Sequence, residues 1–335
     1  MTVPALLLQM AVPGSHANRI ADTFNPVATP AHMEKGIAIL TIAICAVIFV
    51  VVGGMIVYAF VHYRAKRDEQ EFEEPPQVYG SNQIELAWTV IPILIVFVLI
   101  GVSARVIRGI QAHKPAPHSN PVYATVVGHQ WWWEVHYPDL GITTANEIHM
   151  PVSQKGNHAT FFTLESADVD HSFWIPQLSG KTDVIPNRNN FLWMDPSKAG
   201  VYIGQCAEYC GTQHAHMGLR AIVQPVPEFK KWAAWQAKPA VEDPSVAKDK
   251  AVFDSLACIN CHTVRGTIAQ GKFAPDLTHL MSRQTLGAGV LSNTPQHLRD
   301  WVNDPQKYKV GCKMPDMHLD DQQLTEVVAY LETLK

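Results

Sequence analysis

Two long stretches without a charged residue limit what this chain can fold into. No Asp, Glu, Lys or Arg occurs in residues 36–63, and a second uncharged run covers residues 86–104. At a rise of about 1.5 Å per residue, each run is long enough as a helix to cross a hydrocarbon layer about 30 Å thick. We therefore predict membrane-spanning helices over about 36–63 and 86–108, within a hairpin that covers residues 31–114.

The segment between the two runs is polar and carries residues typical of turns. Residues 64–85 contain Pro75, Pro76 and Gly80 together with a string of acids. This composition favours a loop that joins two antiparallel helices. Basic residues flank the spans on both sides, so the positive-inside rule does not orient the hairpin.

The first 30 residues are predicted to form a separate N-terminal segment. An apolar stretch at residues 3–12 precedes Ser15-His16-Ala17, a pattern typical of a signal-peptide cleavage site. No basic leader precedes the apolar stretch. A cleaved signal peptide and an uncleaved extension therefore both stay open.

The bulk composition excludes one class of partner and directs attention to the cysteines. The 335 residues are 47% apolar and 17% charged, with a net charge of −4 and no long basic run. Nucleic-acid binding needs clustered Lys and Arg, so no nucleic-acid partner is expected.

Two tight pairs of cysteines, Cys206 with Cys210 and Cys258 with Cys261, favour metal or cofactor attachment. The remaining cysteines are predicted to be unpaired packing thiols: Cys45 and Cys312.

The region after the hairpin, residues 118–226, has the pattern of a small all-β domain. Short β-type runs occur at residues 122–127, 158–164 and 200–203, with turns between them. No long amphipathic period occurs between residues 120 and 226, so helices are expected to be minor there. We predict an antiparallel sandwich or barrel.

One segment of this region carries a dense set of soft metal ligands. The sequence Cys206-Ala-Glu-Tyr-Cys210-Gly-Thr-Gln-His214-Ala-His216-Met217 lies downstream of an isolated His171. Thiolate, imidazole and thioether ligands select copper over hard cations, although two Cys and two His also suit a tetrahedral zinc site. A disulfide between the two cysteines would need neither the histidines nor the methionine. His216 competes with His214 for the second imidazole position.

This ligand string, with the upstream histidine, resembles the binuclear copper A site of cytochrome c oxidase subunit II, whose copper domain is cupredoxin-like. The resemblance implies two bridging thiolates, two capping imidazoles and a weak axial thioether: Cys206, Cys210, His171, His214 and Met217. It further implies that Glu208 offers its backbone carbonyl to copper. The side chain of Glu208 would then help to hold a Mg ion at the contact with a neighbouring subunit.

Two other segments extend the resemblance. Residues 128–134, Gly-His-Gln-Trp-Trp-Trp-Glu, are similar to the family's aromatic segment near the copper site, with Trp131 where electrons enter. Residues 83–92 resemble the family segment in which Glu85 lies at the mouth of a proton channel. The alternatives are an aromatic core cluster for Trp131 and an ordinary charged helix boundary for Glu85.

A third domain, residues 250–335, is predicted after a linker at residues 227–249 that is rich in Pro, Ala and Lys. One short helix is expected in this linker at about 228–237. The domain carries Cys258-Ile-Asn-Cys261-His262, the motif that attaches haem c through two thioethers and ligates its iron through the histidine. A thioredoxin-like redox pair would need a βαβ context, whereas the flanks of this motif have helical patterns.

The sixth iron ligand is expected to be a methionine, because a His/Met pair raises the haem potential. Three methionines follow the motif: Met281, Met314 and Met317. Met314 is favoured because Met314-Pro315 resembles the distal loop of class I cytochromes c, and residues 274–277 resemble the proximal loop. An apolar stripe after Asp320 and Gln323, which are placed like a capping box, predicts a terminal helix packed on the first helix of an all-α domain.

The order of hairpin, copper domain and cytochrome resembles caa-type haem-copper oxidases, in which a class I cytochrome c is fused to subunit II. The resemblance implies that electrons from cytochrome c pass through haem c and copper A to subunit I, where oxygen reduction is coupled to proton pumping. No catalytic residue is then expected in this chain. It also implies association with subunits I and III and with the lipid bilayer of a bacterial inner membrane, the copper and haem domains being periplasmic. Two alternatives stay open: a copper A subunit of a nitric oxide reductase, and a membrane-tethered electron carrier.

Overall fold

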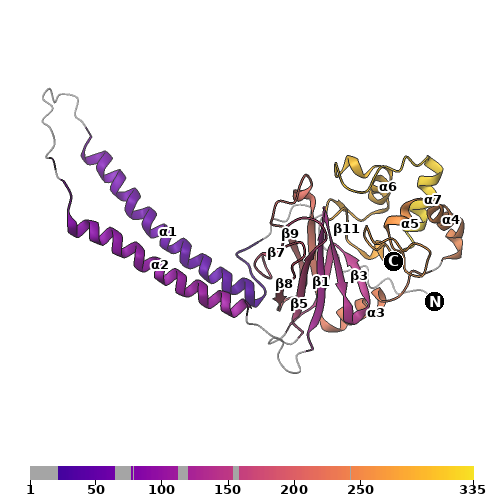
Figure 1. Cartoon of the computed structure of the whole chain (residues 1–335), viewed down its shortest axis with the longest axis horizontal. Coiled ribbons are helices and arrows are strands. Elements are labelled where there is room, and N and C mark those ends of the chain that lie inside the picture. The colour runs from indigo at the N-terminus through magenta and orange to yellow at the C-terminus, as the bar shows by residue number, and fades with distance from the viewer. Residues whose placement is uncertain (1–21, 65–76, 78, 112–119, 154–157, 242) are drawn as a thin grey trace. The chain divides into compact units, whose positions relative to one another are not determined.

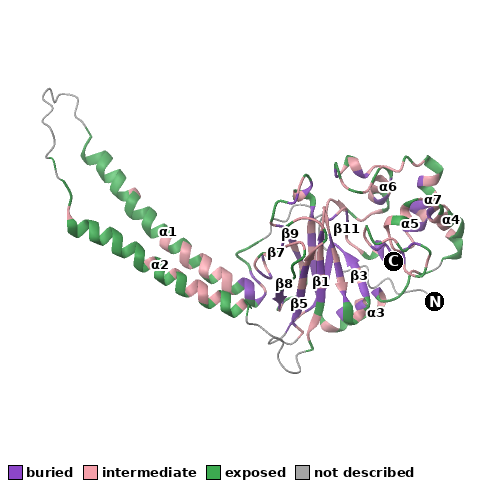
Figure 2. Cartoon of the chain, viewed as in Figure 1, coloured by how far each residue is buried: buried purple, intermediate pink, exposed green. Residues whose placement is uncertain are grey.

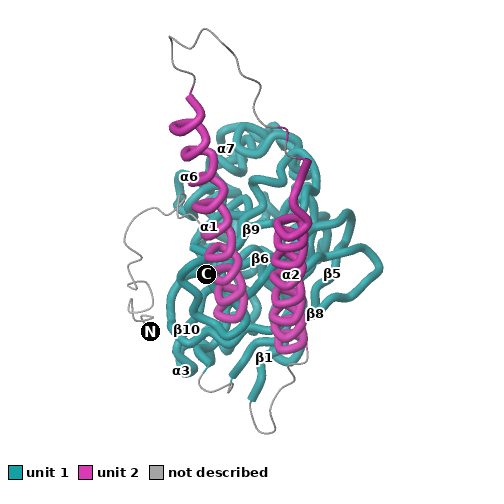
Figure 3. The backbone as a smooth tube through the Cα atoms, turned by 90° about the vertical axis from the view of Figure 1, so that its left-hand side faces the viewer, with its two compact units in different colours: residues 1–31, 115–335 teal, residues 32–114 magenta. Residues whose placement is uncertain are grey.

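The structure, a computed structural model, describes residues 22–64, 77, 79–111, 120–153, 158–241 and 243–335. The segment considered as a possible signal peptide, residues 3–17, lies outside the described residues. The chain divides into two compact units, one of residues 32–114 and one of residues 1–31 together with 115–335 (Figure 3).

The first of these units consists of two long apolar helices. α1 (Thr29–His62) and α2 (Asn82–Gln111) each contain an apolar stretch of 18 residues, with mean hydropathies of 2.9 and 2.7 over those stretches. Their side chains are exposed along much of their length (Figure 2), as at Phe49, which is 77% exposed. A Cβ added to Gly109 near the end of α2 would lie 2.5 Å from Met33 Cε near the start of α1, so the helices are antiparallel neighbours. The predicted hairpin of two helices able to cross a bilayer is confirmed.

The β-region forms a sandwich of two five-stranded sheets (Figure 1). The first sheet has the order β3-β2-β1-β5-β8 and the second the order β4-β10-β9-β6-β7. Val126 in one sheet and Phe173 in the other lie fully buried in one shared core, as expected when two sheets pack face to face. The strands are β1 (Val122–His129), β2 (Trp132–Tyr137), β3 (Ile142–Ala145), β4 (Glu147–Pro151), β5 (Thr160–Ser166), β6 (His171–Trp174), β7 (Thr182–Val184), β8 (Asn190–Met194), β9 (Gly200–Cys206) and β10 (Gly218–Gln224).

The strand pairing differs in part from the antiparallel arrangement predicted. β1 pairs with β5 in parallel, and so does β4 with β10. Alternation of buried residues identifies the core face of a strand but not its neighbour, and a parallel neighbour is reached only through a long connection. The expectation of minor helices is confirmed for the described part of residues 120–225, which contains two short 3₁₀ helices, η2 (Pro138–Leu140) and η3 (His214–His216).

The segment after the sandwich begins with helix α3 (Val226–Gln236), close to the short helix predicted at about 228–237. Phe229 and Ala233 are buried, and Trp232 stacks on His149 of β4 with 4.0 Å between ring centroids. The first half of the segment predicted as a linker therefore packs against the sandwich.

The C-terminal region is mainly helical and has a second hydrophobic core. Its elements are η4 (Pro244–Val246), α4 (Ala247–Ser255), α5 (Cys258–Cys261), η5 (Leu280–Ser282), β11 (Thr285–Leu286), β12 (Leu291–Ser292), α6 (Pro295–Asn303), η6 (Pro305–Lys307) and α7 (Asp321–Leu331). Phe253 of α4 packs against Tyr330 of α7, with 5.1 Å between ring centroids. The Asp320 and Gln323 side chains each accept a hydrogen bond from the other residue's backbone amide. The predicted terminal helix and its capping box are therefore confirmed.

Candidate copper and haem centres

The predicted copper ligands lie at one end of the inner strands of the second sheet. His171 opens β6, Cys206 closes β9, and the loop before β10 carries Cys210, His214 and Met217. Because β9 lies between β6 and β10 in the sheet, the strands bring these residues together although His171 precedes Cys206 by 35 positions.

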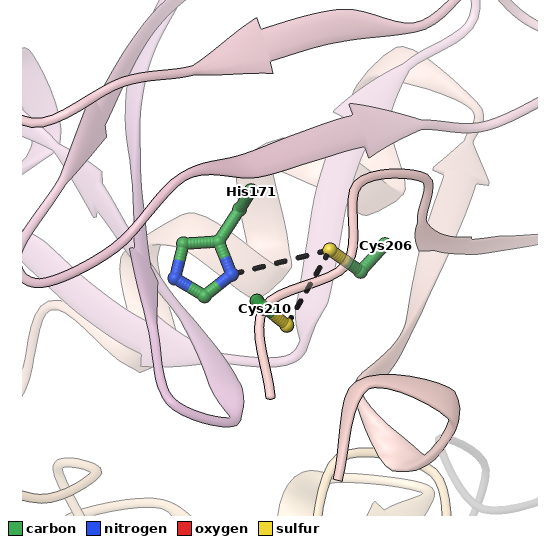
Figure 4. Close-up of side chains that lie close together, drawn as sticks. All are labelled: His171, Cys206 and Cys210. Carbon is green, nitrogen blue, oxygen red and sulfur yellow. Dashed lines mark hydrogen bonds between the residues drawn. The ribbon is translucent and has the colours of Figure 1, made fainter. Parts of the chain in front are cut away.

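The ligand atoms of His171, Cys206 and Cys210 converge on one buried point (Figure 4). Cys206 Sγ lies 3.9 Å from His171 Nδ1 and 3.9 Å from Cys210 Sγ. Cys210 Sγ in turn lies 3.6 Å from His214 Nδ1 and 3.6 Å from Met217 Sδ. Both thiols, the His171 ring and the thioether belong to buried residues, so the site is protected from water.

The chemistry of this donor set fits copper better than structural zinc. Structural zinc takes four strong ligands in a tetrahedron. This site offers more donors than that, because a thioether and the Glu208 carbonyl lie beside the two thiols and two imidazoles. The Glu208 carbonyl is 3.2 Å from Cys206 Sγ. The 3.9 Å between Cys206 Sγ and Cys210 Sγ is far longer than the roughly 2.05 Å of a disulfide. Hydrogen bonding between the thiols lowers the pKa of Cys206 and raises that of Cys210. Soft donors of this kind select copper.

His171 is oriented by Asp168, which the sequence interpretation missed. His171 Nε2 lies 2.9 Å from Asp168 Oδ1, so the ring donates its Nε2 proton and keeps the Nδ1 lone pair for a metal. Asp168 Oδ2 accepts a hydrogen bond from the Gln130 amide at 2.8 Å. Burial opposes ionisation of Asp168, but these hydrogen bonds hold its pKa well below the usual range. An Asp three residues before a predicted ligand is a weak signal in sequence.

Two histidines that compete for one ligand position are separated by the structure. His214 has Nδ1 3.6 Å from Cys210 Sγ. His216 is exposed and its Nδ1 interacts with the Gln213 side chain instead. The ring of His214 is therefore at the site, and the ring of His216 is not.

The haem-attachment motif lines an apolar cavity of about 250 Å³. Cys258, Cys261 and His262 line it together with Leu277 and Leu298. Such a cavity suits a flat, largely apolar macrocycle.

The histidine of the motif is prepared to act as an iron ligand. His262 Nδ1 lies 2.7 Å from the Pro275 carbonyl, so Nδ1 carries the proton and Nε2 keeps a lone pair for iron. Burial lowers the pKa of His262, which keeps the ring neutral. The Pro275 carbonyl belongs to the segment predicted as the proximal loop.

Two of the three methionine candidates line the same cavity. Met314 and Met317 do so, whereas Met281 packs against the hydrophobic core of the C-terminal region. Cys312 also lines the cavity and donates its thiol hydrogen bond to the Met314 carbonyl at 3.4 Å. Cys45 is exposed on α1 and Cys312 is half-buried, so the interpretation of both as packing thiols stays a prediction.

The aromatic segment connects the two candidate centres. The Trp131 indole N–H donates to the Cys210 carbonyl at 3.1 Å, and Trp131 also lines the haem cavity. Trp133 is fully buried and its indole N–H donates to the Met217 carbonyl at 3.1 Å. The core interpretation therefore applies to Trp133, while Trp131 lies between the copper loop and the haem cavity.

Two further residues escaped sequence analysis because nothing local distinguishes them. Lys309 is buried and donates from Nζ to the Trp131 carbonyl at 2.6 Å. Glu147 is buried and accepts hydrogen bonds from the amides of Gln284 and Thr285 in the cytochrome region. Burial raises the pKa of Glu147. Both residues join the sandwich to the cytochrome region within one compact unit.

Glu85 belongs to the other compact unit, residues 32–114. It lies in the first turn of α2 with an exposed side chain, and its backbone carbonyl accepts a hydrogen bond from Thr89 Oγ1 at 2.8 Å. A carboxylate in the first turn stabilises a helix through its interaction with the helix dipole. This position therefore has a structural explanation as well as the predicted role in proton uptake.

Comparison with known proteins identifies three matching families along the chain. The families described as Cytochrome C oxidase subunit II, transmembrane domain, as Cytochrome C oxidase subunit II, periplasmic domain, and as Cytochrome c match residues 17–106, 142–225 and 246–335. They occur in the same order as the hairpin, the sandwich and the haem-motif domain.

Whole-chain relatives carry the name cytochrome c oxidase subunit 2. The protein from Alkalihalophilus pseudofirmus is 34% identical over 304 residues, which cover 89% of this chain and 86% of that protein. The protein from Bacillus sp. (strain PS3) is 33% identical, and the match covers 81% of this chain and 79% of that protein. Among solved structures, the periplasmic domain of subunit II of cytochrome oxidase from Bradyrhizobium japonicum is 31% identical with a TM-score of 0.33, over 36% of this chain and 95% of that one.

These relatives favour an oxidase subunit over a nitric oxide reductase subunit or a tethered carrier. Identity above 30% over most of both chains agrees with the ligand geometry and with the order of the three domains. The chain therefore belongs to the cytochrome c oxidase subunit II family, with a copper A domain and a fused cytochrome c domain.

Proposed function

We propose that this chain receives electrons for a haem-copper terminal oxidase and passes them from haem c to copper A and on to subunit I. The position of Trp131 carries this proposal. Its indole N–H bonds to the carbonyl of Cys210, a candidate copper ligand, and the residue lines the haem cavity. One aromatic residue thus lies against both candidate redox sites.

Bound copper and haem supply the one-electron redox chemistry, and the residues of this chain hold and orient them. The proposed ligands of the binuclear copper site are Cys206, Cys210, His171, His214, Met217 and the backbone oxygen of Glu208. Burial and the Asp168–His171 hydrogen bond keep this set rigid. Little rearrangement is then needed when the charge of the site changes.

The proposed haem site uses Cys258 and Cys261 for covalent attachment and His262 and Met314 as iron ligands. The Pro275 carbonyl fixes the His262 tautomer. The lining of the cavity is mainly apolar, and a His/Met pair in such a surrounding raises the haem potential. These features support a role in delivering electrons.

Further proposals concern the partners and the membrane. The exposed side chain of Glu208 would help to hold Mg at the contact with subunit I. Glu85 would take up protons at the inner side of the membrane. Subunits I and III and the surrounding lipid are the proposed partners in a bacterial inner membrane, with cytochrome c as donor and the copper and haem domains on the periplasmic side. Oxygen reduction coupled to proton pumping is assigned to subunit I, so no catalytic residue is proposed in this chain.

Metal and haem analysis of the purified complex, combined with electron paramagnetic resonance, tests this proposal. Two coppers per subunit II with a mixed-valence signal, and one haem that stays attached after acid-acetone extraction, are the expected result. A single copper or a zinc ion would overturn the copper A assignment. Haem that is removed by the extraction would overturn covalent attachment.

A further inference from the structure

Lys309 is a buried lysine that joins the cytochrome region to the copper domain. The residue is 3% exposed. Its Nζ donates to the Trp131 carbonyl at 2.6 Å and to the Gly287 carbonyl at 2.9 Å. Trp131 precedes Lys309 by 178 positions, and all three residues line the haem cavity. One side chain therefore ties the two domains together at the cavity.

Fold stability alone does not account for a lysine at this position. The ion pairs found among the described residues do not include Lys309, and the titratable groups that face it are the thiols of Cys312 and Cys210. Burial lowers the pKa of Lys309 to about 7, because two carbonyls do not replace the lost hydration. An apolar side chain of similar length would avoid this desolvation.

The residue that Lys309 contacts is also fixed from the copper side. The Trp131 indole N–H and the Gln130 side-chain amide both donate to the Cys210 carbonyl, at 3.1 and 2.8 Å. A Cβ added to Gly211 would lie 3.0 Å from Trp131 Cζ2, so the indole packs closely on the copper loop. Lys309 supplies the corresponding restraint from the cytochrome side.

Other contacts across the same boundary act on the domains and not on the tryptophan. The Gly218 amide donates to the Ala288 carbonyl at 3.0 Å. The Gln213 side chain donates to the Val310 carbonyl at 2.6 Å. Neither of these bonds involves the Lys309 side chain, so the contact of Lys309 with Trp131 is separable from domain docking.

We propose that Lys309 is a positioning residue for electron transfer, which fixes the Trp131 indole between the haem cavity and Cys210 by tying the Trp131 carbonyl to Gly287. The inference rests on the proposed function. In the step concerned, one electron leaves the reduced haem iron and enters the oxidised copper centre, and no bond or proton is transferred. Electron tunnelling weakens steeply as the gap between packed groups widens. A displaced indole therefore slows this step.

The test compares the complete oxidase carrying wild-type subunit II with three variants. Lys309→Met removes both hydrogen-bond donations and keeps most of the side-chain length. Lys309→Gln keeps an amide donor group. Lys307→Met is the matched control, because Lys307 is exposed and its Nζ lies over the Tyr308 ring. The readouts are the rate of haem-to-copper transfer after flash reduction and hydrogen–deuterium exchange in peptides that cover residues 128–134 and 285–289.

Lys309→Met is expected to slow transfer severalfold and to speed exchange in both peptides, with Lys309→Gln between it and the wild type. Lys307→Met is expected to match the wild type. The copper spectrum and the haem midpoint potential are expected to stay unchanged in all variants. Wild-type transfer and exchange in Lys309→Met, with both centres intact, would overturn the inference. If Lys309→Met loses a centre, wild-type behaviour of Lys309→Gln overturns it instead. Failure of the proposed function would give a different result from failure of this inference, because the wild type itself would then show no haem-to-copper transfer.

Discussion

At the scale of single residues, the copper site depends on which of two nearby histidines reaches the thiols. His214 Nδ1 lies 3.6 Å from Cys210 Sγ, whereas His216 is exposed. His214→Ala is expected to lower copper affinity by at least about tenfold and to remove the mixed-valence signal. His216→Ala, as the matched control, is expected to leave copper content and spectrum unchanged. Copper loss in His216→Ala but not in His214→Ala would show that His216 is the ligand and that the assignment to His214 is wrong.

The lowered pKa of Lys309 makes the free energy of unfolding depend on pH. Its pKa is about 7 in the folded protein, against an ordinary value of 10.5. Between these values the unfolded chain holds a proton that the folded chain has released, so the free energy of unfolding rises as pH rises from 7 to 10.5. The contribution is up to about 5 kcal/mol, at about 1.4 kcal/mol per pH unit.

Denaturant unfolding followed by haem absorbance checks this dependence in the wild type and in Lys309→Met. The free energy of unfolding of the wild type is expected to increase relative to that of the variant across the same pH window. Parallel pH profiles for the two proteins would show that Lys309 titrates like an exposed lysine.

Among the residues of the site, those that share a short motif could be predicted from the sequence, and those that act across the fold could not. Cys206, Cys210 and His214 lie within one segment, so their spacing alone indicated a metal. Asp168 and Lys309 act through neighbours that the folded chain brings to them. A polar residue in a loop has many possible partners, and sequence does not choose among them.

At the scale of elements, α7 shows how a local signal determines a structure. Its capping box and its buried face were both visible in the sequence and both occur in the structure. Leu324 is 4% exposed, so Leu324→Ala is expected to destabilise the cytochrome region by about 2–5 kcal/mol. Gln322→Ala, at an exposed position of the same helix, is expected to change stability by less than about 0.5 kcal/mol. Equal unfolding midpoints for the two variants would contradict the packing of α7 on the core.

Strand pairing shows the opposite case at the same scale. The β-runs could be located because apolar residues alternate along them. The parallel pairing of β1 with β5 and of β4 with β10 depends on long connections whose path is set by the whole sandwich. The sequence therefore predicted the class of the domain and not the neighbours of its strands.

At the scale of the whole molecule, the proposed orientation in the membrane can be tested at two exposed positions. Tyr79 is 97% exposed in the segment before α2, and Val241 is 58% exposed after α3. In intact cells, a membrane-impermeant thiol reagent is expected to label Val241→Cys directly and Tyr79→Cys only after the membrane is opened. The wild type, with its six native cysteines, gives the background. The reverse labelling pattern would contradict copper and haem domains on the periplasmic side.

The chain combines a hairpin able to cross a bilayer, a copper A domain and a cytochrome c domain. In the proposed function, electrons reach the copper through the haem. Trp131 is an aromatic residue that both contacts the copper loop and lines the haem cavity. Trp132 also lines the cavity, but its ring stacks on His129 with 4.3 Å between centroids. Replacing these two tryptophans one at a time therefore distinguishes two effects on electron transfer. Loss of Trp131 affects the path to the copper loop, whereas loss of Trp132 changes the lining of the cavity alone.

Flash reduction of the complete oxidase, with haem and copper absorbance followed separately in time, tests whether electrons pass from the haem to the copper by way of Trp131. We expect the haem to be reduced first and the copper centre to follow as the haem is reoxidised. Trp131→Leu is expected to slow this second phase severalfold, while Trp132→Leu leaves it near the wild-type rate. Copper that is reduced before the haem, or at the wild-type rate in Trp131→Leu, would exclude this path.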